Sequence, residues 1–585
     1  MLLAVAVCLT AAAIAAVSVD APAQAAAAPT VYNIDLSTEF RRPREIGGKA
    51  VPNSQSAAHV PAAGVPRPAS TPVSGDTPGL GLSVDGLNLR DQRTADNGNQ
   101  FSLEPPDQAL CVGGDRVLES VNDVMRFRGL GGETLGGVQS LNKFFIGDSA
   151  IIRSTPPVYG AFVSDPKCYY DPALGRFFFT VLSLDRDAAT GDFTGRTDVR
   201  IAVSRTSTPT TDPAGWFIYR IDTTNDGSNG TPANPDCPCL GDQPLIGADA
   251  YGFYVTTNEF PLFVDGFNGA IVYAFDKAAL TTGTLRMTLV ANRPALAEGP
   301  GYSIQPATSP AASEWDTSNN GTAYFLSALD FDATLDNRIA TWALTNTQSL
   351  TTATPRVTLR NAVLPSQVYG QPPDAEQRDG PTPLADATPN AFTGKPGNGP
   401  REHLNLLAGN DDRMQQVVLA DDKLWSGLNT AVKTENGNVN VGIAWFIVDP
   451  TATATTVSGT IVNQGYVAVN RQNVMYPAIG VNTAGEGVMT FTLVGRDYYP
   501  SAAYTPIDAG GTGAISIAGA GAAPADGFSG YRFFGGSGTE RWGDYSAAVA
   551  DASGNVWLAT EYIPGTFGFP PFLANWGTRI MRVTP

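Results

Sequence analysis

One pattern of strand, turn and strand recurs along most of this chain, and it constrains the fold more than any other feature. In its clearest copy, RWGDYSAAVADASGNVWLATEY (541–562), a small-residue run and an apolar run flank the turn DASGN. This turn combines short polar side chains, which bond their own backbone, with a glycine that tolerates positive φ. We expect the two runs to pair as a β-hairpin, which places Asp544 and Glu561 at the same edge of the sheet.

Six further stretches carry the same pattern, among them PPDQALCVGGDRVLESVND, SDPKCYYDPALGRFFFTVLS and GDQPLIGADAYGFYVTTNEF. The copies begin near Asp107, Asp165, Asp242, Gln305, Gln415, Tyr476 and Asp544, and further strand-like runs lie between them. A four-stranded antiparallel unit buries its faces only against neighbours, and closing such units into a ring leaves no open end. The sequence therefore predicts an all-β, seven-bladed β-propeller. Because the copy near Gln305 is degenerate, six or eight blades are the alternatives.

Composition divides the chain into three parts. Residues 1–25 are apolar and end in AQA, which is typical of a secretory signal segment, with a membrane anchor as the alternative. Residues 26–102 form a Pro- and Ala-rich arm and lead-in, and residues 103–585 form the propeller, with a Pro/Gly-rich insertion at 371–400. Whether residues 79–89 add a strand to the last blade is left open. We expect a secreted or cell-envelope protein without a membrane span in the mature chain.

The charge of the chain bears on its partners. The formal net charge is −18. Such a surface repels nucleic acid and anionic membranes, so neither is expected as a partner. The remaining candidates are a glycan or a protein ligand at the cell surface, and we expect the mature chain to be a monomer.

Four cysteines follow the predicted signal segment, and an even number in an exported chain indicates disulfides. Cys111 and Cys168 fall at nearly the same level on neighbouring first strands, which predicts a disulfide between them if the geometry allows it. Cys237-Pro-Cys239 either closes a small ring or stays reduced. A C-x-C metal site is the rival interpretation, but no second cysteine pair is left to complete it.

Carboxylates recur where the first strand of each copy begins. In a propeller the first strands line the central channel, so these carboxylates should approach one another at one mouth. The expected ring comprises Asp107, Asp165, Asp242 and Asp544, with Glu259 and Glu561 slightly outside it and Arg541 close enough to neutralise it.

Such a ring repels itself unless cations or hydrogen-bond donors neutralise it. One interpretation is a Ca²⁺ site formed by the four aspartates, and another is a carboxylate pair for glycoside hydrolysis. The structural alternative is that each carboxylate accepts backbone N–H groups and fixes the geometry of its blade. Trp542, beside Asp544, is the candidate for stacking on a sugar.

The stretches PPDQALCVGGDRVLESVN, GDQPLIGADAYGFYVTTNEF and RWGDYSAAVADASGNVWLATEY resemble a family of exported bacterial β-propeller proteins that is grouped loosely with sialidase-like propellers. The resemblance extends from about residue 103 to residue 583 and implies the fold, not an activity. The chain lacks the S-x-D-x-G-x-T-W box and the R-I-P motif of sialidases. Sialidase activity is therefore not expected.

Three functions remain open on the sequence. The first is a binding or surface-interaction module whose ligand docks at the mouth lined by the starts of the first strands. The second is a glycan-active hydrolase or lyase that uses carboxylates at that mouth, which would need a pocket with two suitably separated carboxylates. The third is a structural protein of the cell envelope.

Overall fold

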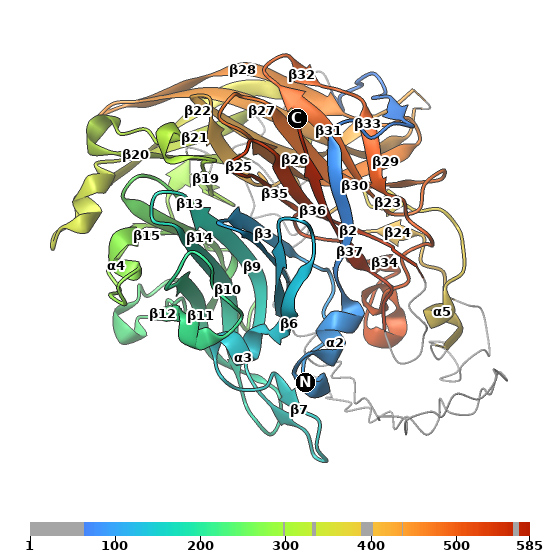
Figure 1. The fold of residues 1–585 in the computed structure, drawn as a ribbon, viewed down its shortest axis with the longest axis horizontal. Helices are drawn as coiled ribbons and strands as arrows, with labels where there is room; N and C mark the ends of the chain where they lie inside the picture. Colours follow the sequence, from blue (N-terminus) through green and yellow to red (C-terminus); the bar gives the residue numbers. More distant parts are fainter. Residues whose placement is uncertain (1–63, 297–298, 330–334, 388–401, 436, 566–572) are drawn as a thin grey trace.

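The computed structural model describes residues 64–296, 299–329, 335–387, 402–435, 437–565 and 573–585. The predicted signal segment and residues 388–400 of the predicted insertion lie outside the described residues. Over the described part, the chain forms four-stranded antiparallel sheets that follow one another around a common centre (Figure 1). No described helix is both long and apolar enough to cross a membrane.

Four of these sheets have four strands, two further groups of four are joined edge to edge into one sheet of eight, and the remaining group is extended by two short strands to a sheet of six. The first strands are β3 (Gln108–Gly113), β9 (Phe162–Asp171), β13 (Cys239–Ala248), β19 (Gln305–Thr308), β25 (Val417–Ala420), β29 (Gln472–Val481) and β35 (Ala547–Ala550). The second strands are β4 (Arg116–Val121), β10 (Arg176–Arg186), β14 (Gly252–Pro261), β20 (Thr322–Ala328), β26 (Lys423–Lys433), β30 (Gly487–Gly495) and β36 (Val556–Tyr562). The third strands are β5 (Val124–Gly129), β11 (Phe193–Ser204), β15 (Gly269–Asp276), β21 (Leu335–Thr345), β27 (Val439–Ala452), β31 (Ser501–Asp508) and β37 (Gly577–Val583). The fourth strands are β6 (Thr134–Ser140), β12 (Trp216–Asp222), β16 (Met287–Asn292), β22 (Thr358–Gly370), β28 (Val457–Val467), β33 (Ile515–Gly519) and β2 (Leu80–Asn88).

The first strands form a closed ring. Each contacts the first strand of the next sheet, from β3 through β9, β13, β19, β25 and β29 to β35, and β35 contacts β3 again. β19 and β25 are also hydrogen-bonded in parallel, through Ala307 and Val417. This arrangement is that of a β-propeller, and the prediction of an all-β propeller is confirmed at this level.

The hairpin predicted from the clearest copy is present as β35 and β36, with Ala547 opposite Ala559. Its turn has the expected chemistry, because Asp551 Oδ1 accepts the backbone N–H of Ser553 at 2.8 Å and of Asn555 at 3.1 Å. Gly554 has a φ of +82°, a conformation that favours glycine. Hydrogen bonds from the Asp551 side chain to the backbone of the turn, together with Gly554, therefore determine where the chain reverses direction in this hairpin.

Apolar side chains between neighbouring sheets hold the ring together. Between the last sheet and the first, Trp557 and Ile580 pack with Val117 in one buried cluster. Between the sheets of β9 and β13, the rings of Phe178 and Phe253 stack with centroids 4.8 Å apart. Each side chain of this size stabilises the fold by about 1.5–3 kcal/mol when fully buried, so the sheets are stable only as neighbours.

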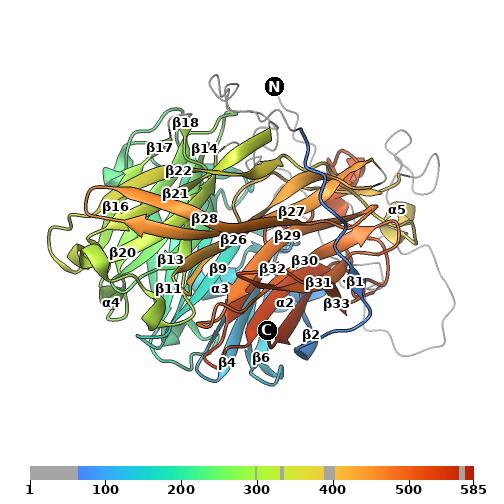
Figure 2. The same ribbon diagram turned by 90° about the horizontal axis from the view of Figure 1, so that it is seen from above.

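The two ends of the described chain meet in one sheet. β2 pairs antiparallel with β37, with Val84 opposite Ile580, so the lead-in supplies the fourth strand of the last sheet. Figure 1 shows this contact as the blue β2 beside the red β37, and Figure 2 shows β1 (Val73–Ser74) beside β33, with which it pairs in parallel. Helix α2 (Leu89–Gly98) follows β2 directly, and its N-cap Asn88 accepts the N–H of Asp91. Residues 79–89, left open by the sequence, therefore close the ring.

Two long connections pack together at the side of the ring where the first strands begin. We call the described residues 371–387, 402–416 and 523–543 the cap. Within it β23 (Ala375–Glu376), β24 (Leu406–Leu407) and β34 (Thr539–Glu540) form a small sheet beside α5 (Pro383–Ala387). Gln377 Nε2 donates to the carbonyls of Leu404 and Ala525 at 3.2 and 3.1 Å. The described part of the predicted insertion is therefore an integral layer of the fold.

The remaining elements are short. They are α3 (Leu141–Phe145), α4 (Lys277–Leu280), β7 (Ile151–Ile152), β8 (Val158–Tyr159), β17 (Ala295–Leu296), β18 (Gly299–Pro300) and β32 (Gly511–Thr512).

Candidate functional site

Three first strands carry the same bulge at the level of the predicted acidic ring. Asp165, Gln243 and Tyr476 each precede a proline and have φ values of +55°, +46° and +58°, and the register to the second strand shifts there. A left-handed backbone is costly for such residues, about 1–3 kcal/mol each, and persists only where the surroundings impose it. Gln243 accepts a hydrogen bond from Arg413, and the Tyr476 hydroxyl donates to the carbonyl of Ala408. The bulges thus turn polar side chains toward the channel and the cap.

Lys167, which the sequence reasoning missed, is the cation of the acidic ring. Its ammonium interacts electrostatically with Asp107, Asp165 and Asp544, and Nζ lies 2.9 Å from the centroid of the Tyr545 ring. Loss of hydration lowers the pKa of Lys167 from its ordinary 10.5 to about 7, while the three carboxylates oppose that shift. Three of the four predicted aspartates therefore come together around a lysine. The available signal was that Asp165 and Lys167 are complementary charges on one strand.

Asp544 is held from two directions. Arg541 Nη2 lies 3.0 Å from both carboxylate oxygens, and Asn410 Nδ2 donates to Oδ1 at 3.2 Å. The next residue, Tyr545, donates its hydroxyl proton to the carbonyl of Pro166 at 3.1 Å. Arg541, expected beside the ring, thus forms an ion pair with Asp544, and Tyr545 links β9 to the segment that leads into β35.

Asp242, the fourth predicted ring aspartate, is buried on β13 with 2% of its surface exposed. One contact from this strand to the cap is made by its neighbour Gln243, which accepts a hydrogen bond from Arg413. Arg413 forms a two-pronged ion pair with Asp411 at 2.7 and 2.8 Å. Tyr302 donates its hydroxyl proton to the same aspartate at 2.8 Å. The cap is therefore fixed to the ring by buried charge-assisted bonds.

A second carboxyl cluster lies under the cap and contains two residues that the sequence did not single out. Glu104 and Glu540 approach each other across Gly527, where a Cβ would collide with both carboxyl groups. Burial is the main cause that raises the pKa of both carboxyls; the charge of Glu104 raises the pKa of Glu540 further, and the charge of Asp526 raises both. The predicted Glu561 joins them, because burial and the charges of Glu540, Glu104 and Asp107 raise its pKa well above the usual range. These carboxyls are held protonated at pH values where a solvated glutamate is ionised.

Two of the predicted site residues, Trp542 and Glu259, lie neither in the acidic ring nor in the buried carboxyl cluster. Trp542 is fully buried in an apolar cluster and its Nε1 donates to Thr492 at 3.2 Å, so its ring offers no face to a sugar. Glu259 lies on β14 and accepts hydrogen bonds from Asn225 and Asn234. Burial raises the pKa of Glu259, and these amide donors oppose that shift.

Glu259 is instead close to two cysteines. Among the described residues, the ligand atoms of Cys237, Cys239 and Glu259 lie within 4.8 Å of one another, whereas the four predicted ring aspartates form no such group. Cys237 and Cys239 are joined by a disulfide. A second disulfide joins Cys111 to Cys168, whose Cα atoms are 5.5 Å apart and belong to neighbouring first strands.

The starts of the first strands are covered, and the described cavity lies at the opposite mouth. Asp107 and Asp544 are 0% and 3% exposed beneath the cap. A cavity of about 380 Å³ opens instead where the first strands end, and is lined by Gly113, Tyr170, Thr308, Val481 and Ala550 among others. The sequence placed the ligand at the strand starts, but the described opening into the channel is at the strand ends.

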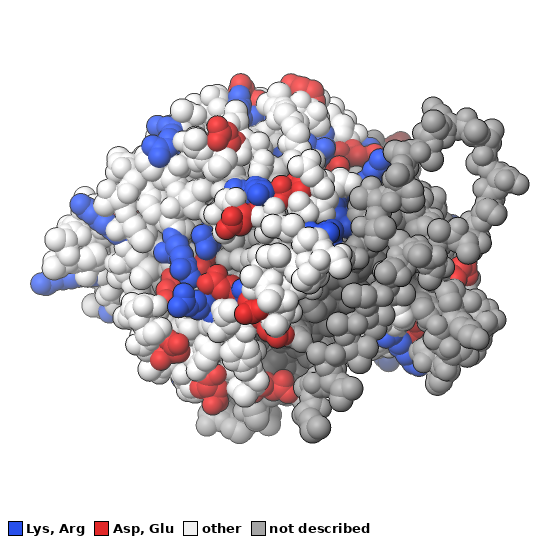
Figure 3. Space-filling model, turned by 90° about the horizontal axis from the view of Figure 1, so that it is seen from below, with Lys and Arg blue, Asp and Glu red and all other residues white. Residues whose placement is uncertain are grey.

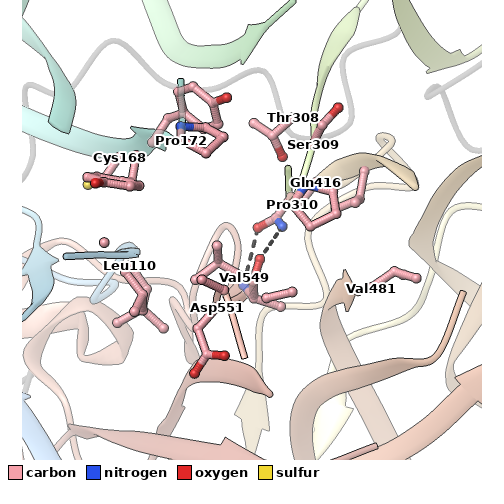
Figure 4. Close-up of a pocket in the computed structure, with 18 of the residues that line it drawn as sticks. Leu110, Cys168, Pro172, Thr308, Ser309, Pro310, Gln416, Val481, Val549 and Asp551 are labelled. Carbon is pink, nitrogen blue, oxygen red and sulfur yellow. Dashed lines mark hydrogen bonds between the residues drawn. The ribbon is translucent and has the colours of Figure 1, made fainter. Parts of the chain in front are cut away.

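This cavity combines apolar walls with a few polar groups, as Figure 4 shows. Gln416 spans one wall, accepting the N–H of Ala548 at 3.2 Å and donating to the carbonyls of Ala548 and Ile479. Ser309 is buried at the cavity wall, and its hydroxyl has no hydrogen-bond partner among the described residues. Lys167 also lines the cavity, so the lysine that interacts with the ring aspartates borders this mouth.

Among the described residues, the face of the molecule drawn in Figure 3 has no patch of charge of a single sign. On the face drawn in Figure 3, Lys, Arg, Asp and Glu are interspersed among uncharged residues. Interspersed charges create no single-sign field that would steer a polyanion. The channel cavity is therefore a better candidate for a ligand site than this face.

No protein-family model matches the chain, and no curated protein matches it. Among solved structures, a protein of unknown function from Dyadobacter fermentans is 9% identical, with 72% of this chain and 94% of that chain covered and a TM-score of 0.33. Trypanosoma rangeli sialidase is 10% identical over 82% of this chain and 60% of the sialidase, with a TM-score of 0.32. Polysaccharide lyase Uly1 is 8% identical over 75% of this chain and 98% of the lyase, with a TM-score of 0.31. Such low identities assign no activity to this chain.

Proposed function

We propose that the protein is an exported, seven-bladed β-propeller that binds a small polar ligand, one or two sugar units in size, in the channel cavity. The observation that carries the proposal is the cavity of about 380 Å³ at the ends of the first strands, which is lined by apolar side chains together with Thr308, Gln416 and Lys167. Ligand sites in proteins are typically concave, mostly apolar and at least about 300 Å³, with a few polar groups that orient the ligand.

The ring of first strands and the apolar clusters between neighbouring sheets support the blade count. Two disulfides support export, because disulfides persist in oxidising compartments.

A neutral carbohydrate suits the chemistry of the cavity wall. Lys167 is already balanced by three aspartates, so the cavity has no unneutralised cation that would demand an anionic ligand. Leu110 and Val418 provide apolar surface for the C–H faces of a sugar, and the half-buried Tyr170 provides an aromatic face. Thr308, which is half-buried in the cavity wall, has a hydroxyl that can donate to or accept from a sugar hydroxyl.

Blocking the mouth tests the proposal. Ala552 is exposed on the turn at the rim of the cavity, so Ala552→Trp should fill the entrance with little effect on stability, and Ala552→Ser is the matched control. We would screen neutral mono- and oligosaccharides by thermal shift and calorimetry, since a ligand of the native state raises the melting temperature. A sugar that binds the wild-type and Ala552→Ser but not Ala552→Trp supports the proposal. Equal binding by both variants places the ligand elsewhere.

The glycan-active alternative is favoured by one observation. Lys167 reaches the cavity and has a pKa lowered to about 7, which suits a general acid or base at neutral pH. If the protein cleaves a polysaccharide, Ala552→Trp and Lys167→Met should both abolish the release of new chain ends. Binding of a sugar without cleavage by the wild-type protein excludes this alternative for that sugar.

A further inference from the structure

A polar cluster outside the channel combines two cysteines with a carboxylate. Cys239 is the first residue of β13, Cys237 lies just before it, and Glu259 lies near the end of the paired strand β14. The ligand atoms of these three residues are within 4.8 Å of one another. Cys239 and Glu259 are buried, whereas Cys237 is half-buried beside the exposed residues Pro235 and Asp236. The cluster is therefore formed inside the sheet but opens to solvent at Cys237.

The carboxylate is oriented by amide groups from separate segments. Asn234 Nδ2 lies 2.8 and 3.1 Å from the two oxygens of Glu259, and Asn225 donates to one of them. Asn268 Nδ2 lies 3.4 Å from Cys239 Sγ and 3.8 Å from Cys237 Sγ. An amide donor facing both sulfurs favours their thiolate form, and fixed neighbours of this kind orient metal ligands in proteins.

The disulfide that now joins the sulfurs closes a very short loop. Cys237 and Cys239 are two positions apart, whereas Cys111 and Cys168 are 57 apart. A loop this short removes little chain entropy from the unfolded state, so the bond adds little to the stability of the fold. Cys237 is half-buried and follows the exposed Asp236, so a reductant approaches the bond from this side. The Cys237–Cys239 bond is therefore the one that a mild reductant should open first.

We propose that this cluster is a redox-gated metal site, at which the reduced Cys237 and Cys239 bind a thiophilic divalent cation such as Zn²⁺ together with Glu259. A dithiol reductant transfers two electrons and two protons to the disulfide, giving two thiols and its own cyclic disulfide. A phosphine does so with one water molecule, whose oxygen it takes up as phosphine oxide and whose two protons pass to the sulfurs. As the cation binds, the two thiol protons pass to solvent. The site holds no metal while the sulfurs are bonded to each other.

Charge and geometry both favour a cation once the bond is open. Two thiolates and a carboxylate place three negative charges in a partly buried site, and a divalent cation relieves their repulsion. Donor atoms of a tetrahedral zinc site lie about 3.5–4 Å apart. A carboxylate oxygen of Glu259 lies within 4.8 Å of both sulfurs, and the two sulfurs, which are bonded to each other in the disulfide, have to separate to this spacing once the bond is open. Water can occupy the fourth position from the side of Cys237. No second cysteine pair is needed, because the tertiary structure supplies the carboxylate.

The test uses the full mature chain and Co²⁺, whose thiolate complexes absorb light, followed by displacement with Zn²⁺. We expect no thiolate–cobalt absorption before reduction. After mild reduction we expect one Co²⁺ per chain, and alkylation with mass spectrometry should assign the freed thiols to Cys237 and Cys239. Glu259→Gln, which keeps the size of the side chain, should weaken Zn²⁺ binding at least about tenfold. The Cys111→Ala/Cys168→Ala double variant is the matched control and should keep the site.

Three results would overturn the proposal. They are absence of thiolate–cobalt absorption in the reduced wild-type protein, unchanged Zn²⁺ affinity in Glu259→Gln, and freeing of Cys111 and Cys168 while Cys237 and Cys239 stay bonded. If Glu259→Gln does not fold, Cys237→Ser decides instead, because Cys237 is half-buried and precedes the strand. Retention of the cobalt site in Cys237→Ser would then refute the proposal, and its loss in a folded variant would support it.

Discussion

Replacing Lys167 by methionine should change how the stability of the protein depends on pH. The pKa of Lys167 is about 7 in the folded protein, against an ordinary value of 10.5 that applies when the chain is unfolded. Between these values the unfolded chain binds a proton that the folded protein does not hold. The free energy of unfolding of the wild-type protein therefore rises with pH in this window through Lys167, and below about pH 7 the contribution is constant.

The size of this rise follows from the pKa difference. A shift of about 3.5 units corresponds to about 4.8 kcal/mol when the whole window is crossed. Between about pH 7 and about pH 9.5 the wild-type protein should gain about 3 kcal/mol relative to Lys167→Met. Because Lys167 keeps some exposure to the cavity, solvent screens part of this effect, and a measured difference of about 1.5–3 kcal/mol is expected.

Urea unfolding of the wild-type protein and of Lys167→Met at about pH 7 and about pH 9.5 measures this difference in the free energy of unfolding. Methionine has no ionisable group, so the difference in slope between the wild-type protein and Lys167→Met reports on the lysine. Lys143→Met is the matched control, because the Lys143 side chain is 37% exposed on α3 and its loss should leave the pH dependence unchanged. An equal gain in stability with pH in Lys167→Met and in the wild-type protein would refute the reasoning. In that case the Lys167 ammonium is not enclosed in the acidic ring, and Lys167 is not an ionisable group of the cavity with a lowered pKa.

Two further predictions concern buried charges elsewhere in the ring. Lys277 bridges two sheets, with Nζ 2.7 Å from Asp171 and a second bond to the carbonyl of Asp249, so Lys277→Met should cost about 3–5 kcal/mol in the free energy of unfolding. Chemical unfolding of the Asp171→Asn/Lys277→Met double variant should recover much of this loss, and no recovery would argue against the ion pair. Glu104 is held protonated beside Glu540, so the native state loses stability as pH rises from the ordinary carboxyl pKa through the raised one. Glu104→Gln mimics the protonated form and should be more stable than the wild-type protein above this range, by about 1.4 kcal/mol per unit of pKa shift, and no more stable at acid pH. Melting curves at acid and alkaline pH distinguish this from a general stabilisation.

The site itself was only partly predictable. The recurrence of aspartate at the strand starts predicted that charged groups gather there, and in the structure Asp107, Asp165 and Asp544 interact electrostatically with Lys167. Lys167 was overlooked because it is a single lysine in one copy, whereas the pattern was defined by what the copies share. Glu104 and Glu540 lie outside the repeated hairpins, so no spacing connects them, and only the cap places them side by side.

What the sequence determined by itself is local. Polar turns such as DASGN and the apolar runs beside them specify the hairpins, because a few neighbouring residues satisfy one another's backbone groups. Repetition of the hairpin then predicts a ring, since such sheets must bury their faces against one another. The tertiary structure decided the rest: that β2 pairs with β37, that the cap covers the strand starts, that the described cavity opens at the strand ends, and that Glu259 lies beside Cys237 and Cys239. Each of these depends on contacts between segments far apart in the chain, whose geometry is set by ring closure and side-chain packing rather than by any local pattern.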